Sequence, residues 1–205
     1  MLIISASNVS ASGEKSRSLQ AAAKIKNRLS SPNRKIEIID LRKYHLSFCV
    51  MCEKCLENQK CVQPDDFNTL FDTWNEHNQI ILVVPHYALI PSKLLCMFEK
   101  IQERYYLNYC SGKQQDIPVK NVMLIAHGGL IKNYEEVYIK NIINPLKGII
   151  ESIGGKVDND NLDVPLCFGV KEYLNKTDTD SVCYAKIDNV EKENEILEKV
   201  IGYYS

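Results

Sequence analysis

The chain has 205 residues, of which 45% are hydrophobic and 25% are charged, and its formal net charge is −1 at pH 7. These values are typical of one globular domain spanning residues 1–205, and without a basic excess we expect neither nucleic acid nor a membrane as a partner. No apolar run approaches the roughly 18 residues that cross a bilayer, and the first residues lack a secretory signal, so we expect a cytoplasmic protein.

The first half of the chain alternates between patterns typical of strands and of helices. In chain order, these are a strand over 1–5, a helix over 16–29, a strand over 35–40, a helix over 65–77, a strand over 79–85 and a helix over 91–106. The predicted strands are short apolar runs, and the predicted helices carry apolar side chains every three or four positions. Ser12 or Ser16 is placed to cap the first helix.

The second half continues this alternation. It has an exposed loop over 107–118, a buried strand over 119–129 with a closing Gly-Gly turn, a helix over 133–155 with Pro145 as a candidate kink, an ambiguous stretch over 156–168 that could end in a strand, and a last helix over 180–204. Alternation of this kind predicts a parallel sheet with helices on both faces, and so a single α/β domain.

Three loops follow predicted strands, which is where open α/β sheets bind their ligands. The first loop, "SASNVSASGEKSRS", is rich in serine and has two nearby cations. Its serines are Ser5, Ser7, Ser10, Ser12, Ser16 and Ser18, and its cations are Lys15 and Arg17. Hydroxyls at a helix start suit a phosphate, and without a GxGxxG or GxxxxGK[ST] pattern a single terminal phosphate is favoured. The alternative is a serine-rich turn with one capping hydroxyl.

The other two loops offer a rigid aromatic residue and a pair of glycines. The loop over 85–92 places Tyr87 between two prolines, which would stiffen it against a flat ring; the alternative is that Tyr87 only packs. The loop over 126–130 contains Gly128 and Gly129, which permit close approach of a ligand to the backbone, unless they only form a turn. His127 beside them is either a ligand contact or an ordinary surface or hydrogen-bonded histidine.

Together the segments "ISAS…SRSL", "PHYALIPSKL" and "AHGG" resemble the NAD(P)H-dependent FMN reductases of the flavodoxin-like fold. The resemblance implies a three-layer fold with a five-stranded parallel sheet and helices on both faces. It also implies that FMN is the cofactor, with its phosphate on the serine-rich loop and its ring between the other two loops. The FMN-binding residues expected on this basis are Ser5, Ser7, Ser12, Ser16, Arg17, Ser18, Pro85, His86, Tyr87, Ala88, His127, Gly128 and Gly129.

The segment over 47–64 holds half of the eight cysteines of the chain. Cys49, Cys52, Cys55 and Cys61 follow the spacing C-x2-C-x2-C-x5-C. Structural zinc sites usually pair two CxxC knuckles across a longer gap, whereas this compact spacing suits a loop around one [4Fe–4S] cluster. The alternatives are a cluster-free thiol loop, a zinc site and disulfides. Lys54 and Lys60 would offset thiolate charge.

This cysteine motif after the second strand, followed by Asp65 and Asp66 before a helix, resembles the iron–sulfur flavoproteins, a subgroup of the same family; the likeness covers about residues 1–130. It implies an oxidoreductase that passes electrons between FMN and a [4Fe–4S] cluster. Ferredoxin, NAD(P)H, a quinone or oxygen species are the expected redox partners. The cysteine loop leaves the sheet between the second strand and the next helix, where a flavin of the same subunit is difficult to reach. We therefore expect a homodimer or homotetramer in which electrons cross a subunit boundary.

Two rival functions remain open on the sequence alone. One is a cluster-free NAD(P)H-dependent FMN or quinone reductase, and the other is a redox- or metal-sensing binding protein whose switch is the cysteine loop. The remaining cysteines, Cys96, Cys110, Cys167 and Cys183, are scattered, and Cys96 is expected in the core. None of them pairs with an obvious base, so no catalytic residue is assigned.

Overall fold

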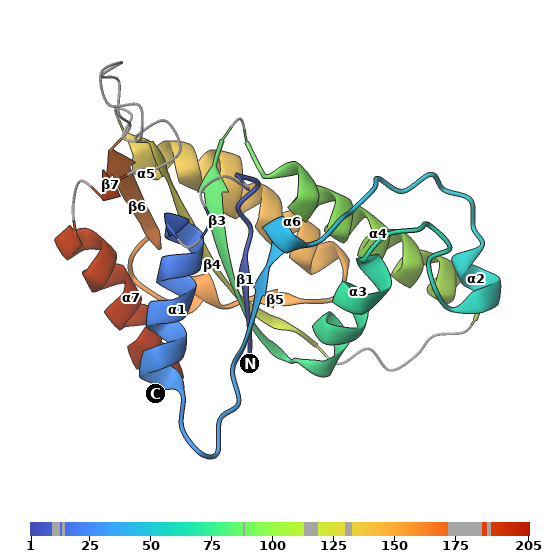
Figure 1. The fold of residues 1–205 in the computed structure, drawn as a ribbon, viewed down its shortest axis with the longest axis horizontal. Helices are drawn as coiled ribbons and strands as arrows, with labels where there is room; N and C mark the ends of the chain where they lie inside the picture. Colours follow the sequence, from blue (N-terminus) through green and yellow to red (C-terminus); the bar gives the residue numbers. More distant parts are fainter. Residues whose placement is uncertain are drawn as a thin grey trace.

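The protein is a parallel sheet with helices packed on both of its faces (Figure 1). The computed structural model describes residues 1–9, 13, 15–87, 89–112, 119–129, 133–171, 186–187 and 190–205. The strands are β1 (Leu2–Ser5), β2 (Glu37–Asp40), β3 (Gln79–His86), β4 (Asn121–Gly129), β5 (Lys156–Val157), β6 (Cys167–Lys171) and β7 (Lys186–Ile187). The helices are α1 (Arg17–Leu29), η2 (Leu41–Lys43), α2 (Cys55–Asn58), α3 (Phe67–Glu76), α4 (Ser92–Cys110), α5 (Tyr134–Tyr138), η3 (Ile139–Ile143), α6 (Asn144–Ser152), η4 (Asp158–Asn161) and α7 (Val190–Tyr204).

The described residues form a seven-stranded sheet in the order β2-β1-β3-β4-β6-β7, with β5 paired to β4. The strands β2, β1, β3, β4 and β6 are parallel to their neighbours, and β7 pairs antiparallel with β6. Counted along the chain, the five principal parallel strands have the order 2-1-3-4-5, which is the doubly wound order of flavodoxin. The predicted flavodoxin-like α/β fold is therefore confirmed.

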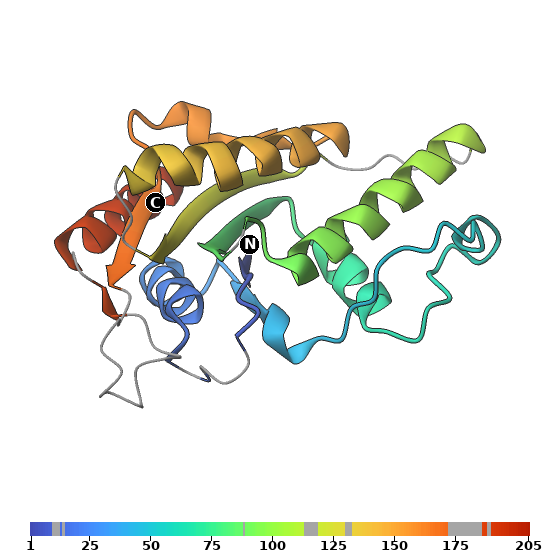
Figure 2. The same ribbon diagram turned by 90° about the horizontal axis from the view of Figure 1, so that it is seen from above.

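Side chains of the central strands alternate between two cores. In β3, Ile80, Leu82 and Val84 face the core formed with α3, α4 and α6, whereas Ile81 and Val83 face the core formed with α1 and α7. Figure 2 shows the helices above and below the sheet seen edge-on. Because both faces are covered, β3 is apolar at nearly every position, as the sequence predicted. No helix among the described residues combines the length and apolar composition needed to cross a membrane.

The predicted helix over 133–155 is interrupted. It forms α5 and α6 with the π-helical turn η3 between them. Pro145 has no N–H to donate to the carbonyl of Asn141, four residues earlier, so the regular α-helical ladder cannot continue there. A wider π turn is a common way to absorb such a break. In place of the kink expected at Pro145, the helix contains the π turn η3, which ends two residues before this proline.

Three other expectations for the second half need correction. The strand β4 runs through Gly129, so the two glycines are not a turn but are paired with β3 and β6. The helix α4 extends to Cys110 and takes up part of the expected loop over 107–118. Of the helix predicted over 180–204, the structure describes α7 from Val190 onwards and an edge strand, β7, at Lys186–Ile187, whereas residues 180–185, 188 and 189 lie outside the described residues. The sequence could not reveal β7, because it is two residues long.

The core under α4 provides a test of this arrangement. Phe98 is 1% exposed and meets Trp74 edge-on with ring centroids 5.6 Å apart, whereas Leu95 on the same helix is 40% exposed. Phe98→Ala should lower the free energy of unfolding by about 3–5 kcal/mol, because it leaves a cavity. Leu95→Ala should change it by no more than about 0.5 kcal/mol. Urea denaturation measures both values, and equal losses would contradict the assigned packing.

Candidate functional site

The end of β1 and the start of α1 hold two buried hydroxyl groups that have no hydrogen-bond partner among the described residues. Ser5 is 0% exposed and Ser16 is 4% exposed, and both Oγ atoms are unpaired. Ser16 occupies the position before α1 but makes no side-chain cap there, and the first turn of α1 has no acidic residue. A buried polar group without a partner costs about 1–3 kcal/mol, and the helix start favours negative charge. These features fit an anionic ligand.

The first and second predicted loops contact each other in this region. Ser5 pairs with Val83 in register, so the ends of β1 and β3 lie side by side. Beyond them, the Ser7 and Tyr87 hydroxyls are 2.8 Å apart, and the Asn8 side-chain amide donates to Ser92 Oγ over 3.2 Å. The hydroxyl of Ser7 therefore links the two loops that sequence reasoning assigned to the phosphate and to the ring.

Ser18 and His127 are brought together in the interior. Ser18 Oγ lies 2.7 Å from His127 Nε2, both residues are buried, and the His127 ring stacks on Phe168 with centroids 5.1 Å apart. Burial, aided by the charge of Arg17, lowers the pKa of His127 to about 3, so the ring is neutral. The predicted contacts of both residues with FMN remain a prediction.

The ends of β3 and β4 meet a side-chain cluster from α5 and η3. His86 Nε2 lies 3.3 Å from the side-chain nitrogen of Asn141, its ring centroid lies 5.1 Å from that of Tyr138, and burial lowers the pKa of His86. A Cβ on Gly128 would lie 2.8 Å from the Tyr138 hydroxyl and 3.0 Å from the His86 Cβ. Gly128 is therefore a glycine because these two side chains fill the space beside it.

The other predicted FMN residues are placed as follows. Pro85 is buried within β3, and Gly129 accepts a hydrogen bond from the Tyr138 hydroxyl at its carbonyl. Arg17 is the first residue of α1 and donates to Gln20 Oε1 over 2.7 Å. Ser12 and Ala88 lie outside the described residues.

The four cysteines of the 47–64 segment line one small hollow, together with residues that include Met51 and Glu103. The backbone there is left-handed at three residues other than glycine, namely Met51, Glu53 and Gln59, with φ values of 49°, 58° and 52°. The Met51 backbone N–H is directed at the Cys49 thiol, although burial raises the pKa of Cys49 overall. The cysteines that the structure describes are all free thiols. Strained backbone of this kind is common at functional sites.

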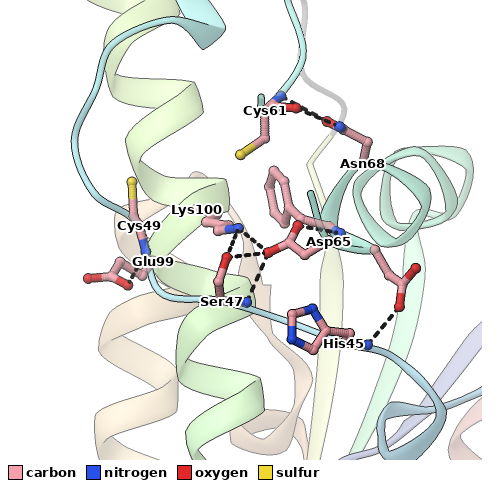
Figure 3. Close-up of polar contacts among 10 residues, drawn as sticks. His45, Ser47, Cys49, Cys61, Asp65, Asn68, Glu99 and Lys100 are labelled. Atoms are coloured by element: carbon pink, nitrogen blue, oxygen red, sulfur yellow. Dashed lines mark hydrogen bonds and ion pairs between the residues drawn. The ribbon is translucent and has the colours of Figure 1, made fainter. Parts of the chain in front are cut away.

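The cysteine segment is fastened to α3 and α4 through its backbone (Figure 3). The Asn68 side chain accepts from the Cys61 N–H at 2.9 Å and donates to the Cys61 carbonyl at 2.8 Å, and Glu99 accepts from the Cys49 N–H at 3.0 Å. Asp65 accepts from both the backbone N–H and the hydroxyl of Ser47, and it forms an ion pair with Lys100. These contacts fix the ends of the loop without using a thiol.

A site for a single metal ion finds no support in this geometry. Among the described residues, no group of three or more histidine, cysteine or acidic side chains could hold a metal ion. The predicted [4Fe–4S] cluster thus has no support from ligands gathered around one ion. In Figures 1 and 2 the segment around α2 also lies far from the start of α1 along the molecule.

Three candidate residues, Arg104, Asp40 and Arg42, were not identified from the sequence. Arg104 lies 3.8 Å from the Phe71 ring centroid and is close enough to Cys55 and Cys61 to interact electrostatically. The structure thus puts beside these thiols a cation that the sequence did not indicate, and the roles of Lys54 and Lys60 stay predictions. Asp40 and Arg42 form a buried ion pair at the end of β2. Asp40 is the last residue of the strand predicted over 35–40 and Arg42 lies two residues beyond it, but a residue pattern does not show that the two side chains pair.

The family model described as NADPH-dependent FMN reductase matches residues 1–109. Solved structures with a similar fold include an azoreductase from Bacillus anthracis str. Sterne, with 15% identity and a TM-score of 0.55 over 99% of this chain and 97% of that chain. The azoreductase AzrA has 16% identity and a TM-score of 0.55 over 100% and 98%. An FMN-dependent NADH-azoreductase from B. anthracis str. Ames Ancestor, in complex with FMN, has 14% identity and a TM-score of 0.54 over 99% and 96%. None of the curated proteins compared with the chain matches it.

The ion pair under the cysteine segment should control stability in acid. Burial raises the pKa of Asp65, but hydrogen bonds from Lys100 and Ser47 outweigh this and lower it to about 2. The pKa of Asp65 in the folded protein is thus below the pKa of an ordinary aspartate. The ion pair therefore stabilises the protein fully above about pH 4, and this stabilisation is lost as the pH falls towards 2.

Lys100→Met should therefore lower the free energy of unfolding by about 3–5 kcal/mol at pH 7, because it leaves the Asp65 charge buried and unpaired. The difference between variant and wild type should shrink between pH 4 and 2, which urea denaturation at several pH values measures. Lys147→Met is the control, because the Lys147–Asp160 pair is exposed and should add little. A pH-independent difference would contradict the assigned role of the pair.

Proposed function

The chain belongs to the NADPH-dependent FMN reductase family, a family of flavin-dependent oxidoreductases, and on this premise we propose that it oxidises NAD(P)H by means of FMN without a metal cluster. The observation that carries the proposal is the pair of buried, unpartnered hydroxyls of Ser5 and Ser16 beside the start of α1. An FMN phosphate would give both hydroxyls an acceptor and would meet the positive end of the helix dipole.

The ends of β1 and β3 have separate tasks in this proposal. Ser5, Ser16 and the first backbone amides of α1 bind the phosphate, and Tyr87 and His86 line the side of the ring. Asn141 orients His86 through its side-chain amide. Bound FMN would supply the two-electron chemistry, and the protein positions it and excludes water. The similar solved structures named as azoreductases support a conjugated organic acceptor, such as a quinone or an azo compound.

We further propose that the enzyme is cytoplasmic and that it forms a homodimer or homotetramer. A short, exposed Tyr87 loop favours an active site that a second subunit completes, since Tyr87 and Leu89 are 45% and 55% exposed.

Ser16→Ala tests the phosphate site. The variant should bind FMN about 10–100 times more weakly than the wild type, because it loses a hydrogen bond to a charged group. Its affinity for riboflavin, which lacks the phosphate, should be nearly unchanged. Quenching of flavin fluorescence measures both dissociation constants, and anaerobic reduction of bound FMN by NADPH or NADH tests the donor.

Ser30→Ala is a matched control, because Ser30 is an exposed serine at the opposite end of the same helix. It should bind both flavins like the wild type. Equal weakening of FMN and riboflavin by Ser16→Ala would contradict the phosphate site, and a protein that binds no FMN would overturn the proposed function.

A second candidate function keeps the electron relay between FMN and a [4Fe–4S] cluster, with ferredoxin as a further partner. The observation that favours it is that Cys49, Cys52, Cys55 and Cys61 line one hollow. The four thiolates of such a cluster bind four different iron atoms, so they need not converge on one point as the ligands of a single ion do. The bound cluster would supply one-electron transfer.

Anaerobic reconstitution with iron and sulfide separates the two candidates. The relay requires about four iron and four acid-labile sulfide per chain in the wild type and a loss of both in Cys52→Ser. Cys110→Ser is the control, because Cys110 is also exposed but lies at the end of α4, outside the hollow. FMN binding without stoichiometric iron and sulfide would leave the cluster-free reductase as the function.

A further inference from the structure

Asp40, the last residue of β2, and Arg42, in η2, form a bidentate ion pair. Arg42 Nε donates to Asp40 Oδ1 over 2.8 Å, and Nη2 donates to Oδ2 over 2.6 Å. The backbone N–H of Arg42 donates to the same carboxylate over 3.2 Å. The side chains are 7% and 6% exposed, so the pair is almost completely removed from water. Replacing such a pair by apolar side chains is often neutral or stabilising, so fold stability alone does not account for it.

The third nitrogen of the guanidinium reaches across to the segment between β1 and α1. Arg42 Nη1 donates to the carbonyl of Gly13 over 2.5 Å. The same carbonyl accepts from the backbone N–H of Ser16 over 3.2 Å. Gly13 has a positive φ of 50°, a conformation that glycine adopts without strain. The Gly13 carbonyl oxygen thus connects Arg42 to Ser16, the residue at the start of α1 whose hydroxyl has no partner among the described residues.

We infer that Arg42 is a positioning residue for the FMN phosphate: it holds the Gly13 carbonyl, and with it the turn that leads into Ser16, in the shape that receives the anion. The inference rests on the proposed function. Asp40 supplies the fixed end of this connection, because the backbone of β2 is paired with β1. Preorganised groups bind more tightly because less ordering is required when the ligand arrives.

Direct binding of the phosphate by Arg42 is the main alternative, since arginine commonly pairs with phosphate. Two observations oppose it. The charge of the guanidinium is matched by Asp40 at contact distance. In addition, each of its three nitrogens already donates to a protein oxygen, two to the carboxylate and one to the carbonyl. The arrangement suits a group that fixes the backbone better than one that meets a ligand.

The two roles predict opposite results for conservative variants. Arg42→Lys keeps the charge but loses the planar fork that joins two acceptors. If Arg42 positions the loop, this variant should bind FMN about tenfold more weakly, with the riboflavin affinity changed less than about twofold. Asp40→Asn should also weaken FMN, because the guanidinium loses its anchor. If Arg42 bound the phosphate directly, Asp40→Asn would free its charge and tighten FMN.

The experiment measures the dissociation constants of FMN and riboflavin for the full chain by fluorescence quenching, with urea denaturation to establish that each variant is folded. Arg28→Met is the matched control: Arg28 also forms a bidentate pair, with Glu198, but that pair is exposed and lies on the far end of α1. It should not change the ratio of the two constants. A wild-type protein that does not prefer FMN over riboflavin would refute the proposed phosphate site itself.

If the wild type prefers FMN and Arg42→Lys keeps that preference, the positioning role of Arg42 is wrong while the FMN site stands. Tighter FMN binding by Asp40→Asn would also overturn it, in favour of a direct ligand. Equal weakening of FMN and riboflavin in Arg42→Lys would likewise overturn it, because that result indicates a general loosening of the fold.

Discussion

The parallel pairing of β1 with β3 is the constraint on which the candidate FMN site depends. It sets Ser5 opposite Val83, and it thereby puts the segment after β1 beside the segment after β3. The chain goes from β1 outwards to β2 and then returns to β3 on the other side of β1. Such a reversal leaves a crevice at the carboxyl ends of the strands, because the connecting segments diverge there. The contact between Ser7 and Tyr87 joins the two segments that leave these strands.

The end of β1 and the cysteine segment are held in place by different interactions. At the β1 end, the hydroxyls of Ser5 and Ser16 are held by the sheet and the helix start and have no partner among the described residues, which is expected of groups that bind an anion. At the cysteine segment, the backbone is irregular and is held by side chains of α3 and α4. The first region owes its shape to strand topology, whereas the second depends on a few specific polar contacts.

The sequence was sufficient for most of the fold because the central strands are covered on both faces. An apolar run such as residues 80–84 predicts a buried strand. The alternation of such strands with amphipathic helices predicts the α/β fold class. The serine-rich loop was identified for the same reason, since it follows such a strand. The Asp40–Arg42 pair was missed because its significance depends on Gly13, 29 residues away from Arg42. The π turn before Pro145 and the packing of Gly128 against Tyr138 are likewise consequences of tertiary contacts that residue patterns do not contain.

The contacts that hold the cysteine segment in place decide whether the gathering of its thiols indicates a metal. In small metal-dependent domains the metal folds the loop, so the gathering of the ligands is itself a sign of the metal. Here Asp65, Lys100 and Ser47 close the base of the segment, and Asn68 fixes Cys61, all without a thiol (Figure 3). The loop therefore has a reason to keep its shape in the absence of a cluster. The proximity of the four cysteines therefore does not by itself indicate a metal cluster.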